Sequence, residues 1–198
     1  MGGSSAVSSY LEALPSGLES YPDHLHKAAI FREFLVGLDT AELAEAVPSE
    51  LAPLVLTPPP VNAWLPEVHA HAVYIAACDV LFADEAAFVR AAYENNLRLL
   101  ESPLYNILFK LVSPERVLGG AASRWSKFHR GQELVLDEAG HGRAVVRLVA
   151  PMGLTTPLLA RCYGTGFRAA IEAAGGAGVK VEVEATGRGG YRFEARWR

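Results

Sequence analysis

The sequence has few of the residues on which common catalytic and metal-binding motifs depend. It contains two cysteines, Cys78 and Cys162, among 198 residues, and no Cys-x-x-Cys or His-x-x-x-His motif. Both cysteines fall within apolar helical patterns, which is typical of packed thiols in a reducing compartment. No serine lies in a Gly-x-Ser-x-Gly motif. These absences argue against a disulfide scaffold, a zinc finger and a serine hydrolase.

Long hydrophobic runs and an excess of positive charge are also missing. No apolar run approaches the ~20 residues that a membrane-spanning helix needs, and no basic start leads into a hydrophobic segment. The net charge is −4, so we expect no general attraction to nucleic acid or anionic lipid. We therefore expect a cytoplasmic protein that binds neither membranes nor nucleic acid.

What is present indicates a globular chain with a proline-rich connector. Apolar residues make up 51% and charged residues 20% of the sequence, which is typical of a folded domain. Met1 to Ser9 is predicted to be a flexible tail, and Pro22 to Val36 an amphipathic helix. Prolines at 48, 53 and 58–60 predict an extended connector in which no helix continues. We predict a helical extension over 1–60 and an α+β domain over 61–198.

The second half of the chain carries its own start and stop signals. Helices are predicted over Trp64 to Phe82, after the Asp84 cap, and after each of two Ser-Pro pairs, Ser102-Pro103 and Ser113-Pro114. The last of these helices is predicted to end at Gly131. Thr156-Pro157 repeats the cap signature before a helix that Gly175-Gly176 ends.

Alternating apolar residues surround that last helix and predict strands. They extend over 133–137, 143–150, 179–185 and 191–197. The apolar faces of the last two strands match if Ala185 pairs with Tyr191. The predicted fold class is α+β, in which N-terminal helices precede a strand-strand-helix-strand-strand unit that forms a four-stranded antiparallel sheet covered by helices on one face.

The histidines do not predict a metal site. His24-x-His26 and His69-x-His71 both fall in predicted helices, where residues two apart point about 200° apart and cannot share one ion. His129 is predicted at a helix end, where it favours the helix dipole. We expect no metal site and no catalytic residue, since no acid–base or nucleophile constellation is visible.

One segment resembles a known fold. Gly153-Leu154 precedes a helix that runs to Ala174, and the valine-rich strand VKVEVE follows. The segment 147–184 resembles the last third of the haem–nitric-oxide-binding domain, a fold shared with the 4-vinyl reductase domain and the Bet3-type transport subunits. Residues 64–197, which include LVSPERVLGGAASRWSKFHRGQELVL, look still more like a family of myxobacterial paralogues thought to share it.

The chain departs from the haem-binding members of this superfamily. In those members a Tyr-x-Ser-x-Arg triplet holds the haem propionates, and the matching positions here are Arg147, Val149 and Pro151. No histidine occurs between His71 and His129. The resemblance therefore implies the fold without the haem, and we expect no cofactor.

Two functions from different classes remain, and an enzyme ranks third. The first is a non-enzymatic signalling or scaffolding module that acts through protein contacts as a homodimer, with an exposed apolar patch at Phe31 and Phe34. The second is a small-molecule sensor with an apolar ligand between helices and sheet. Its candidate lining is Tyr105, Phe109, Trp125, Leu159, Cys162 and Tyr163.

Overall fold

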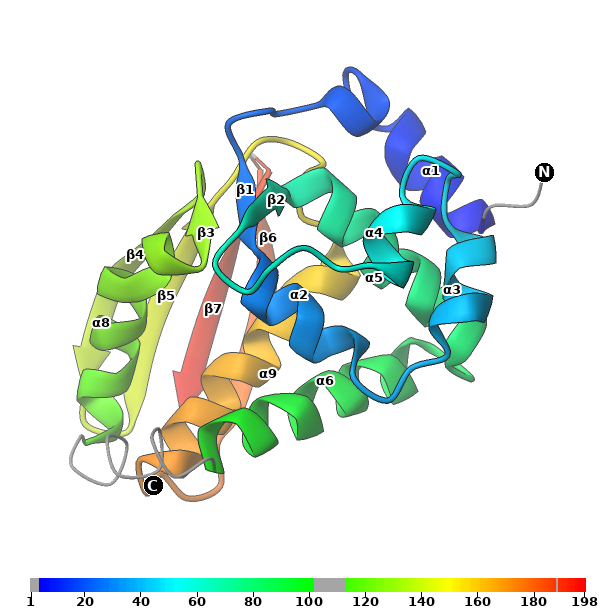
Figure 1. Ribbon diagram of the computed structural model, residues 1–198. Helices are drawn as coiled ribbons and strands as arrows, with labels where there is room; N and C mark the ends of the chain where they lie inside the picture. Colours follow the sequence, from blue (N-terminus) through cyan, green and yellow to red (C-terminus); the bar gives the residue numbers. More distant parts are fainter. Residues whose placement is uncertain (1–3, 102–112, 188) are drawn as a thin grey trace. The chain divides into compact units, whose positions relative to one another are not determined.

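The computed structural model describes residues 4–101, 113–187 and 189–198, and it is α+β as predicted (Figure 1). The described residues form two compact units. Unit 1 lies within Met1–Phe88, Lys127–Gly131 and Met152–Leu154. Unit 2 lies within Val89–Ser126, Gln132–Pro151 and Thr155–Arg198.

Unit 1 combines helices with a three-stranded antiparallel sheet in which β1 is the central strand, in the order β2-β1-β3. Its elements are α1 (Ser5–Glu12), a 3-10 turn (Gly17–Glu19), β1 (Leu25–Lys27), α2 (Ala28–Leu35), α3 (Thr40–Ala46), α4 (Ala52–Leu56), β2 (Trp64–Pro66), α5 (Glu67–Leu81), the start of α6 (Glu85–Glu101) and β3 (His129–Arg130). The Asp84 carboxylate accepts from the Ala87 N–H at 2.7 Å, which confirms the predicted cap of α6.

The helix α5 forms the interior of unit 1. Every residue from Ala70 to Cys78 is buried. A helix that is buried on all sides needs apolar or small residues around its whole circumference. The run AHAVYIAAC meets this requirement, with only one histidine and one tyrosine to supply polar atoms.

The sequence-based boundaries fail at four places in unit 1. Residues 5–12 of the predicted tail form α1, in which Val7 and Tyr10 are buried. The helices predicted from Pro22 and from Trp64 begin only at Ala28 and Glu67, because the three residues before each of them form β1 and β2, which pair with each other. The predicted extended connector contains α4, whose first turn includes Pro53, a position where the missing proline N–H costs nothing.

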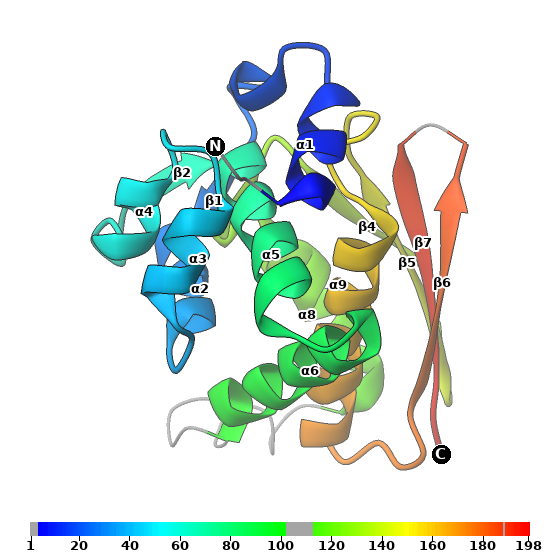
Figure 2. The same ribbon diagram turned by 90° about the vertical axis from the view of Figure 1, so that its right-hand side faces the viewer.

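Unit 2 contains the four-stranded antiparallel sheet, in the order β4-β5-β7-β6. Two helices, α8 and α9, lie on the same face of this sheet (Figure 2). The elements are the remainder of α6, α8 (Pro114–Arg124), most of a 3-10 turn (Trp125–Lys127), β4 (Glu133–Gly140), β5 (Arg143–Val149), α9 (Pro157–Ala173), β6 (Lys180–Thr186) and β7 (Gly190–Arg196). The predicted sheet and the covering of one face are confirmed.

Several local predictions hold in unit 2. The Thr156 side chain caps α9 by accepting from the Leu159 N–H at 3.3 Å. Ala185 pairs with Tyr191, as the alternating pattern requires.

The helix after Ser113-Pro114 ends at Arg124 rather than at Gly131, because His129 and Arg130 pair with β1 in unit 1.

The core of unit 2 lies between the sheet and its helices. It includes Leu118 of α8, Phe167 and Ile171 of α9, and Val146 and Phe193 of the central strands. Gly164 allows α9 to approach the sheet closely, since a Cβ there would lie 3.1 Å from the Val183 side chain.

The predicted boundary at 60/61 does not separate the two units. β1 precedes the proline-rich connector and β2 follows it, and their backbones are hydrogen-bonded to each other. The first compact unit therefore continues through the connector to residue 88.

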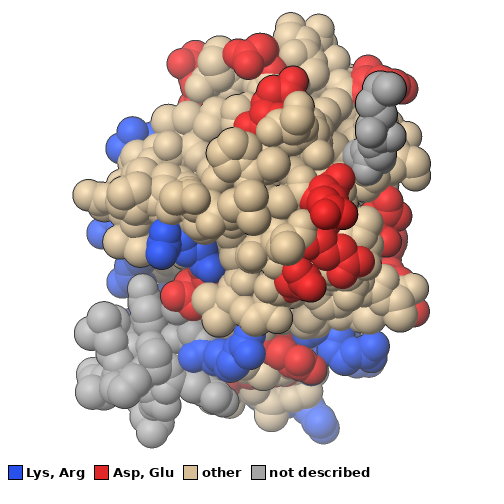
Figure 3. All heavy atoms as spheres, turned by 45° about the vertical axis from the view of Figure 1, so that its right-hand side comes forward, with Lys and Arg blue, Asp and Glu red and all other residues tan. Residues whose placement is uncertain are grey.

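Two surface properties bear on function. Among the described residues, no helix is long and apolar enough to cross a membrane. On the face drawn in Figure 3, acidic and basic side chains form small groups separated by uncharged surface. That distribution agrees with the modest net charge of −4.

Candidate functional site

Four ionisable side chains meet in the interior of unit 1. His26 of β1 and His129 of β3 are direct cross-strand partners, so their side chains lie on the same face of the sheet. Glu67 and His71 are one turn apart on α5 and share a face of that helix. All four side chains are buried, and the side chain of Glu67 is 0% exposed.

The Glu67 carboxylate is the centre of this cluster. Its Oε1 atom lies 3.0 Å from His71 Nε2, 3.0 Å from His129 Nδ1 and 3.4 Å from His26 Nδ1. The two Nδ1 atoms of His26 and His129 are themselves 3.4 Å apart. Three imidazole nitrogens therefore surround one carboxylate oxygen. We call these four side chains, together with Tyr74, the Glu67 cluster.

The next shell fixes the orientation of two of the rings. The Tyr74 hydroxyl lies 2.6 Å from His26 Nε2. His71 Nδ1 lies 2.8 Å from the Leu154 carbonyl oxygen, which is an acceptor only, so this nitrogen carries a proton. The other nitrogen of His71, Nε2, faces Glu67 Oε1 at 3.0 Å, so the ring is held between the Leu154 carbonyl and the Glu67 carboxylate.

The electrostatics of the site combine burial with these contacts. Burial alone raises the pKa of the Glu67 carboxyl, but His129 and His26 lower it more, so the pKa lies well below its usual range. Burial lowers the pKa of His26 to about 4, against the opposing effect of Glu67. His26 is therefore a neutral imidazole at pH 7, with one nitrogen lone pair free of a proton.

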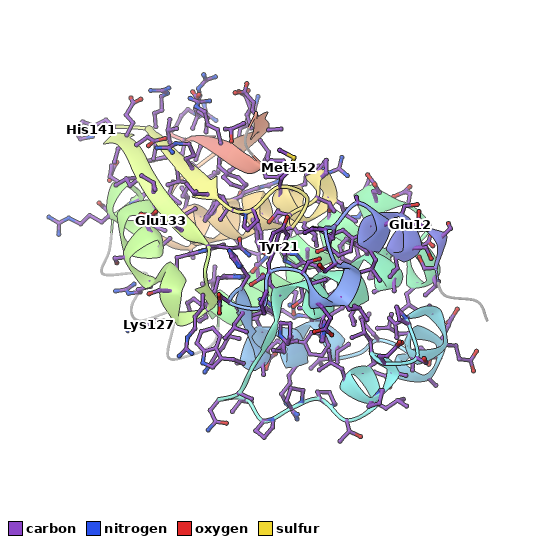
Figure 4. All side chains as sticks on the ribbon, turned by 90° about the horizontal axis from the view of Figure 1, so that it is seen from above. Glu12, Tyr21, Lys127, Glu133, His141 and Met152 are labelled. Carbon is purple, nitrogen blue, oxygen red and sulfur yellow. The ribbon has the colours of Figure 1, made fainter. Side chains whose placement is uncertain are left out.

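The chain segment 152–154 joins the cluster to the rest of unit 1. The Leu154 carbonyl accepts from the Tyr10 hydroxyl at 3.0 Å as well as from His71. The Tyr21 hydroxyl donates to the Met152 carbonyl at 2.7 Å, and Figure 4 labels both residues. Burial and the nearby Glu67 charge raise the pKa of the Tyr10 phenol, so this group remains a donor.

Sequence reasoning missed this cluster for a specific reason. It placed both His-x-His pairs in helices and His129 at a helix end, whereas His26 and His129 lie on paired strands. The argument from helical divergence therefore does not apply to His26. One usable signal was present, since Glu67 and His71 have the i, i+4 spacing of a helical pair. Strand pairing between residues 103 positions apart left no comparable signal.

The described residues of the predicted ligand lining lie in unit 2. Tyr105 and Phe109 lie outside the described residues. The other four residues are in unit 2, where Leu159 is buried and Cys162 is half-buried. The Trp125 and Tyr163 rings pack edge to face with centroids 5.4 Å apart. A ligand-binding role for this set stays a prediction.

The apolar patch expected on the N-terminal helix is not exposed as predicted. Phe31 is 0% exposed. Phe34 is half-buried, with its ring centroid 4.4 Å from Tyr74 and 6.0 Å from Phe88. The expected exposure of Phe31 is wrong because α2 packs this ring into the interior of unit 1. Partner binding at this helix stays a prediction.

A second group of charges, in unit 2, is neutralised by its own partners. Glu194 of β7 contacts the guanidinium groups of Arg143, Arg192 and Arg196 at 2.6–2.8 Å. Hydrogen bonds from Arg143 and Arg192 lower the pKa of Glu194 to about 2. Arg143 also pairs with Glu138 and Arg192 with Glu184. Three guanidinium groups therefore face three carboxylates, and this ionic network on the sheet carries no net charge.

Comparison with known proteins gives the fold class. No protein-family model matches the chain, and no curated protein matches its sequence. A crystal structure of an Fe(II) unliganded H-NOX protein from K. algicida is similar over 87% of this chain and 96% of its own, with a TM-score of 0.60 and 11% identity. A mutant of that protein is similar over the same shares, with a TM-score of 0.62 and 10% identity. The fold is therefore H-NOX-like.

The resemblance to the haem-binding domain places the residues that would hold the haem propionates at 147, 149 and 151. The side chains at these positions do not fit that role. Arg147 is ion-paired with Asp137 at 2.7 Å, and Val149 is an apolar side chain with 44% exposure. With Pro151 as the third residue, these positions lack the hydroxyl groups that hold propionates. Among the described histidines, His26, His71 and His129 are engaged with Glu67.

Proposed function

We propose that this protein is a haem-free sensor module, and that the Glu67 cluster in unit 1 is its receptor site. The observation that carries the proposal is a fully buried carboxylate with three imidazole nitrogens within 3.4 Å of one oxygen. Burying so many ionisable groups is costly, and apolar residues of similar volume would stabilise the fold at least as well. Ionisable groups retained in an interior favour a functional role.

The fold supports a sensor better than a scaffold. The similar structures are of an H-NOX protein described as Fe(II) and unliganded. A ligand-binding module on this fold matches the sensor class of the second predicted function, with the Glu67 cluster in place of the predicted apolar pocket between helices and sheet. The scaffold hypothesis placed an exposed apolar patch at Phe31 and Phe34, whereas Phe31 is buried and Phe34 is half-buried. In this proposal the module is non-enzymatic and cytoplasmic. Homodimerisation, a protein partner for the output and membership of the myxobacterial family belong to the same proposal.

The chain provides a route by which the site can affect unit 2. His71 is hydrogen-bonded to the Leu154 carbonyl, and the chain passes from unit 1 to unit 2 between Leu154 and Thr155. The next residue, Thr156, is the N-cap of α9. A change in the position of His71 would therefore act on the backbone two residues before this helix cap.

Native mass spectrometry tests the proposal on protein purified without added ligand, with the denatured mass as reference. We expect one equivalent of additional mass in the wild type and its loss in Glu67→Gln. Glu12→Gln is the matched control, because Glu12 is exposed on α1 in the same unit. The proposal is contradicted by an unchanged native mass together with no thermal stabilisation by Zn²⁺, Fe²⁺, nitric oxide or carbon monoxide.

A further inference from the structure

The geometry points to a specific ligand for the Glu67 cluster: a divalent first-row transition-metal ion held by His26 Nδ1, His129 Nδ1 and the Glu67 carboxylate. This inference rests on the proposed function, since it names what the receptor site binds. The three side chains come from three different elements, β1, β3 and α5, and all are buried.

The spacing of the three donor atoms matches that of ligands around one ion. Their separations are 3.4 Å, 3.4 Å and 3.0 Å. Nitrogen and oxygen ligands lie ~2.0–2.1 Å from a tetrahedral Zn²⁺, which places neighbouring ligand atoms about 3.3 Å apart. An ion slightly outside the plane of the three atoms would reach each of them with small side-chain adjustments.

A neutral His26 places a lone pair beside the Glu67 carboxylate. With Nε2–H donated to the Tyr74 hydroxyl, the Nδ1 lone pair of this ring lies 3.4 Å from Glu67 Oε1 and 3.4 Å from His129 Nδ1. A proton on His129 Nδ1 can be donated to either acceptor. A cation in the place of that proton would be bound by all three atoms.

The surrounding groups are those that metal ligands require. The Tyr74 hydroxyl can accept from His26 Nε2–H at 2.6 Å, which leaves the Nδ1 lone pair for the ion. His71 Nε2 lies 3.0 Å from Glu67 Oε1, and this ring is itself fixed by the Leu154 carbonyl. Ligating histidines and carboxylates are normally oriented by such second partners.

The donor set also selects the class of ion. Two imidazoles and one carboxylate favour Zn²⁺ or Fe²⁺, whereas Mg²⁺ and Ca²⁺ prefer oxygen ligands alone. Three protein ligands leave at least one coordination position for a small exogenous ligand. A sensor on this site would therefore respond to the ion or to a molecule bound at that position.

The test measures metal content and metal binding in the full chain. Protein is expressed in media supplemented with Zn²⁺ or, anaerobically, with Fe²⁺, and bound metal is measured by elemental mass spectrometry. We expect one equivalent of one of these ions in the wild type and in His141→Gln, a control in an exposed loop. Comparison of the two media identifies the ion.

Two sets of variants separate ligands from outer partners. We expect His129→Gln and His26→Gln to lose binding far beyond the ~10–100-fold weakening expected for Tyr74→Phe, which removes an outer partner. X-ray absorption on the loaded wild type gives an independent readout that needs no variant. It should show two imidazole nitrogens and carboxylate oxygen around the ion.

The possible outcomes distinguish the two proposals. A folded wild-type protein that binds neither ion but carries an organic adduct overturns the metal assignment and leaves the sensor proposal standing. Equal metal binding by wild type and His129→Gln, or an absorption spectrum without imidazole, also overturns the assignment. A protein that binds neither ion, carries no adduct and is not stabilised by nitric oxide or carbon monoxide contradicts both proposals.

Discussion

At the scale of single residues, Tyr74 shows how the Glu67 cluster depends on one hydroxyl group. His26 is 1% exposed, and its Nε2 atom has the Tyr74 hydroxyl 2.6 Å away. Water cannot replace that partner without entering a packed interior. The tyrosine ring also packs against Phe34, with centroids 4.4 Å apart. The hydroxyl therefore contacts a histidine of the Glu67 cluster, and the ring packs in the core of unit 1.

Tyr74→Phe separates these two roles. Removing the hydroxyl leaves a buried histidine nitrogen without this partner, so we expect the free energy of unfolding to fall by about 2 kcal/mol. Urea unfolding in the presence of a metal chelator measures this loss independently of any bound ion. Tyr21→Phe is the control in the same unit, because its hydroxyl bond to Met152 is exposed, and should change stability by less than about 0.5 kcal/mol. Equal losses in the two variants would contradict this account.

At the scale of elements, the paired strands show that sequence patterns predict long strands and miss short ones. The β6–β7 hairpin has the predicted register because one face alternates apolar residues over seven positions on each strand. The strands β1 and β2 have three residues each. Three residues are too few to distinguish a period of two from a period of 3.6. Both were therefore predicted as the first turns of the helices that follow them.

Gly190→Ala tests the close approach of β7 to β5. Gly190 begins β7, and a Cβ at this position would overlap the Leu148 carbonyl oxygen of the neighbouring strand. The backbone must shift to admit the methyl group, so we expect a loss of about 2–3 kcal/mol in the free energy of unfolding. Gly187→Ala in the same hairpin has nothing within 4 Å of the added carbon. It should unfold at nearly the wild-type urea concentration, and a similar loss in both would rule out the steric cause.

At the scale of the whole molecule, the N-terminal segment belongs to a folded unit. β1 is the central strand of the order β2-β1-β3, so both neighbouring strands depend on it for backbone hydrogen bonds. The helix α1 adds further contacts to α5. The segment 1–60, predicted from sequence to be an extension, thus supplies part of the interior of unit 1.

Deletion of residues 1–60 should therefore unfold unit 1. Hydrogen exchange followed by mass spectrometry on the 61–198 chain would report each segment separately. We expect the amides of β2 and α5 to lose their protection, because β1 and the apolar partners of α5 are gone. Protection is expected to persist in β5 and β7, whose partners all remain. Protected α5 amides in the shortened chain would show instead that the first 60 residues are a true extension.

The sequence by itself determined the local structure wherever the signal spans neighbouring residues. Thr156-Pro157 fixed the start of α9, since a cap and a proline act within one turn. Apolar alternation fixed the hairpin register and the α+β class in the same way. The resemblance in residues 147–184 implied the fold that the similar structures show.

Only the tertiary structure decided the candidate site. His26, Glu67 and His129 lie on three elements, and the distance from His26 to His129 along the chain is 103 residues. Their meeting depends on the pairing of β1 with β3 and on α5 packing beside that sheet. Such long-range pairing is set by the balance of burial over the whole unit, which no window of neighbouring residues contains. The sequence contains the histidines and the carboxylate of the site, but only the fold brings their side chains together.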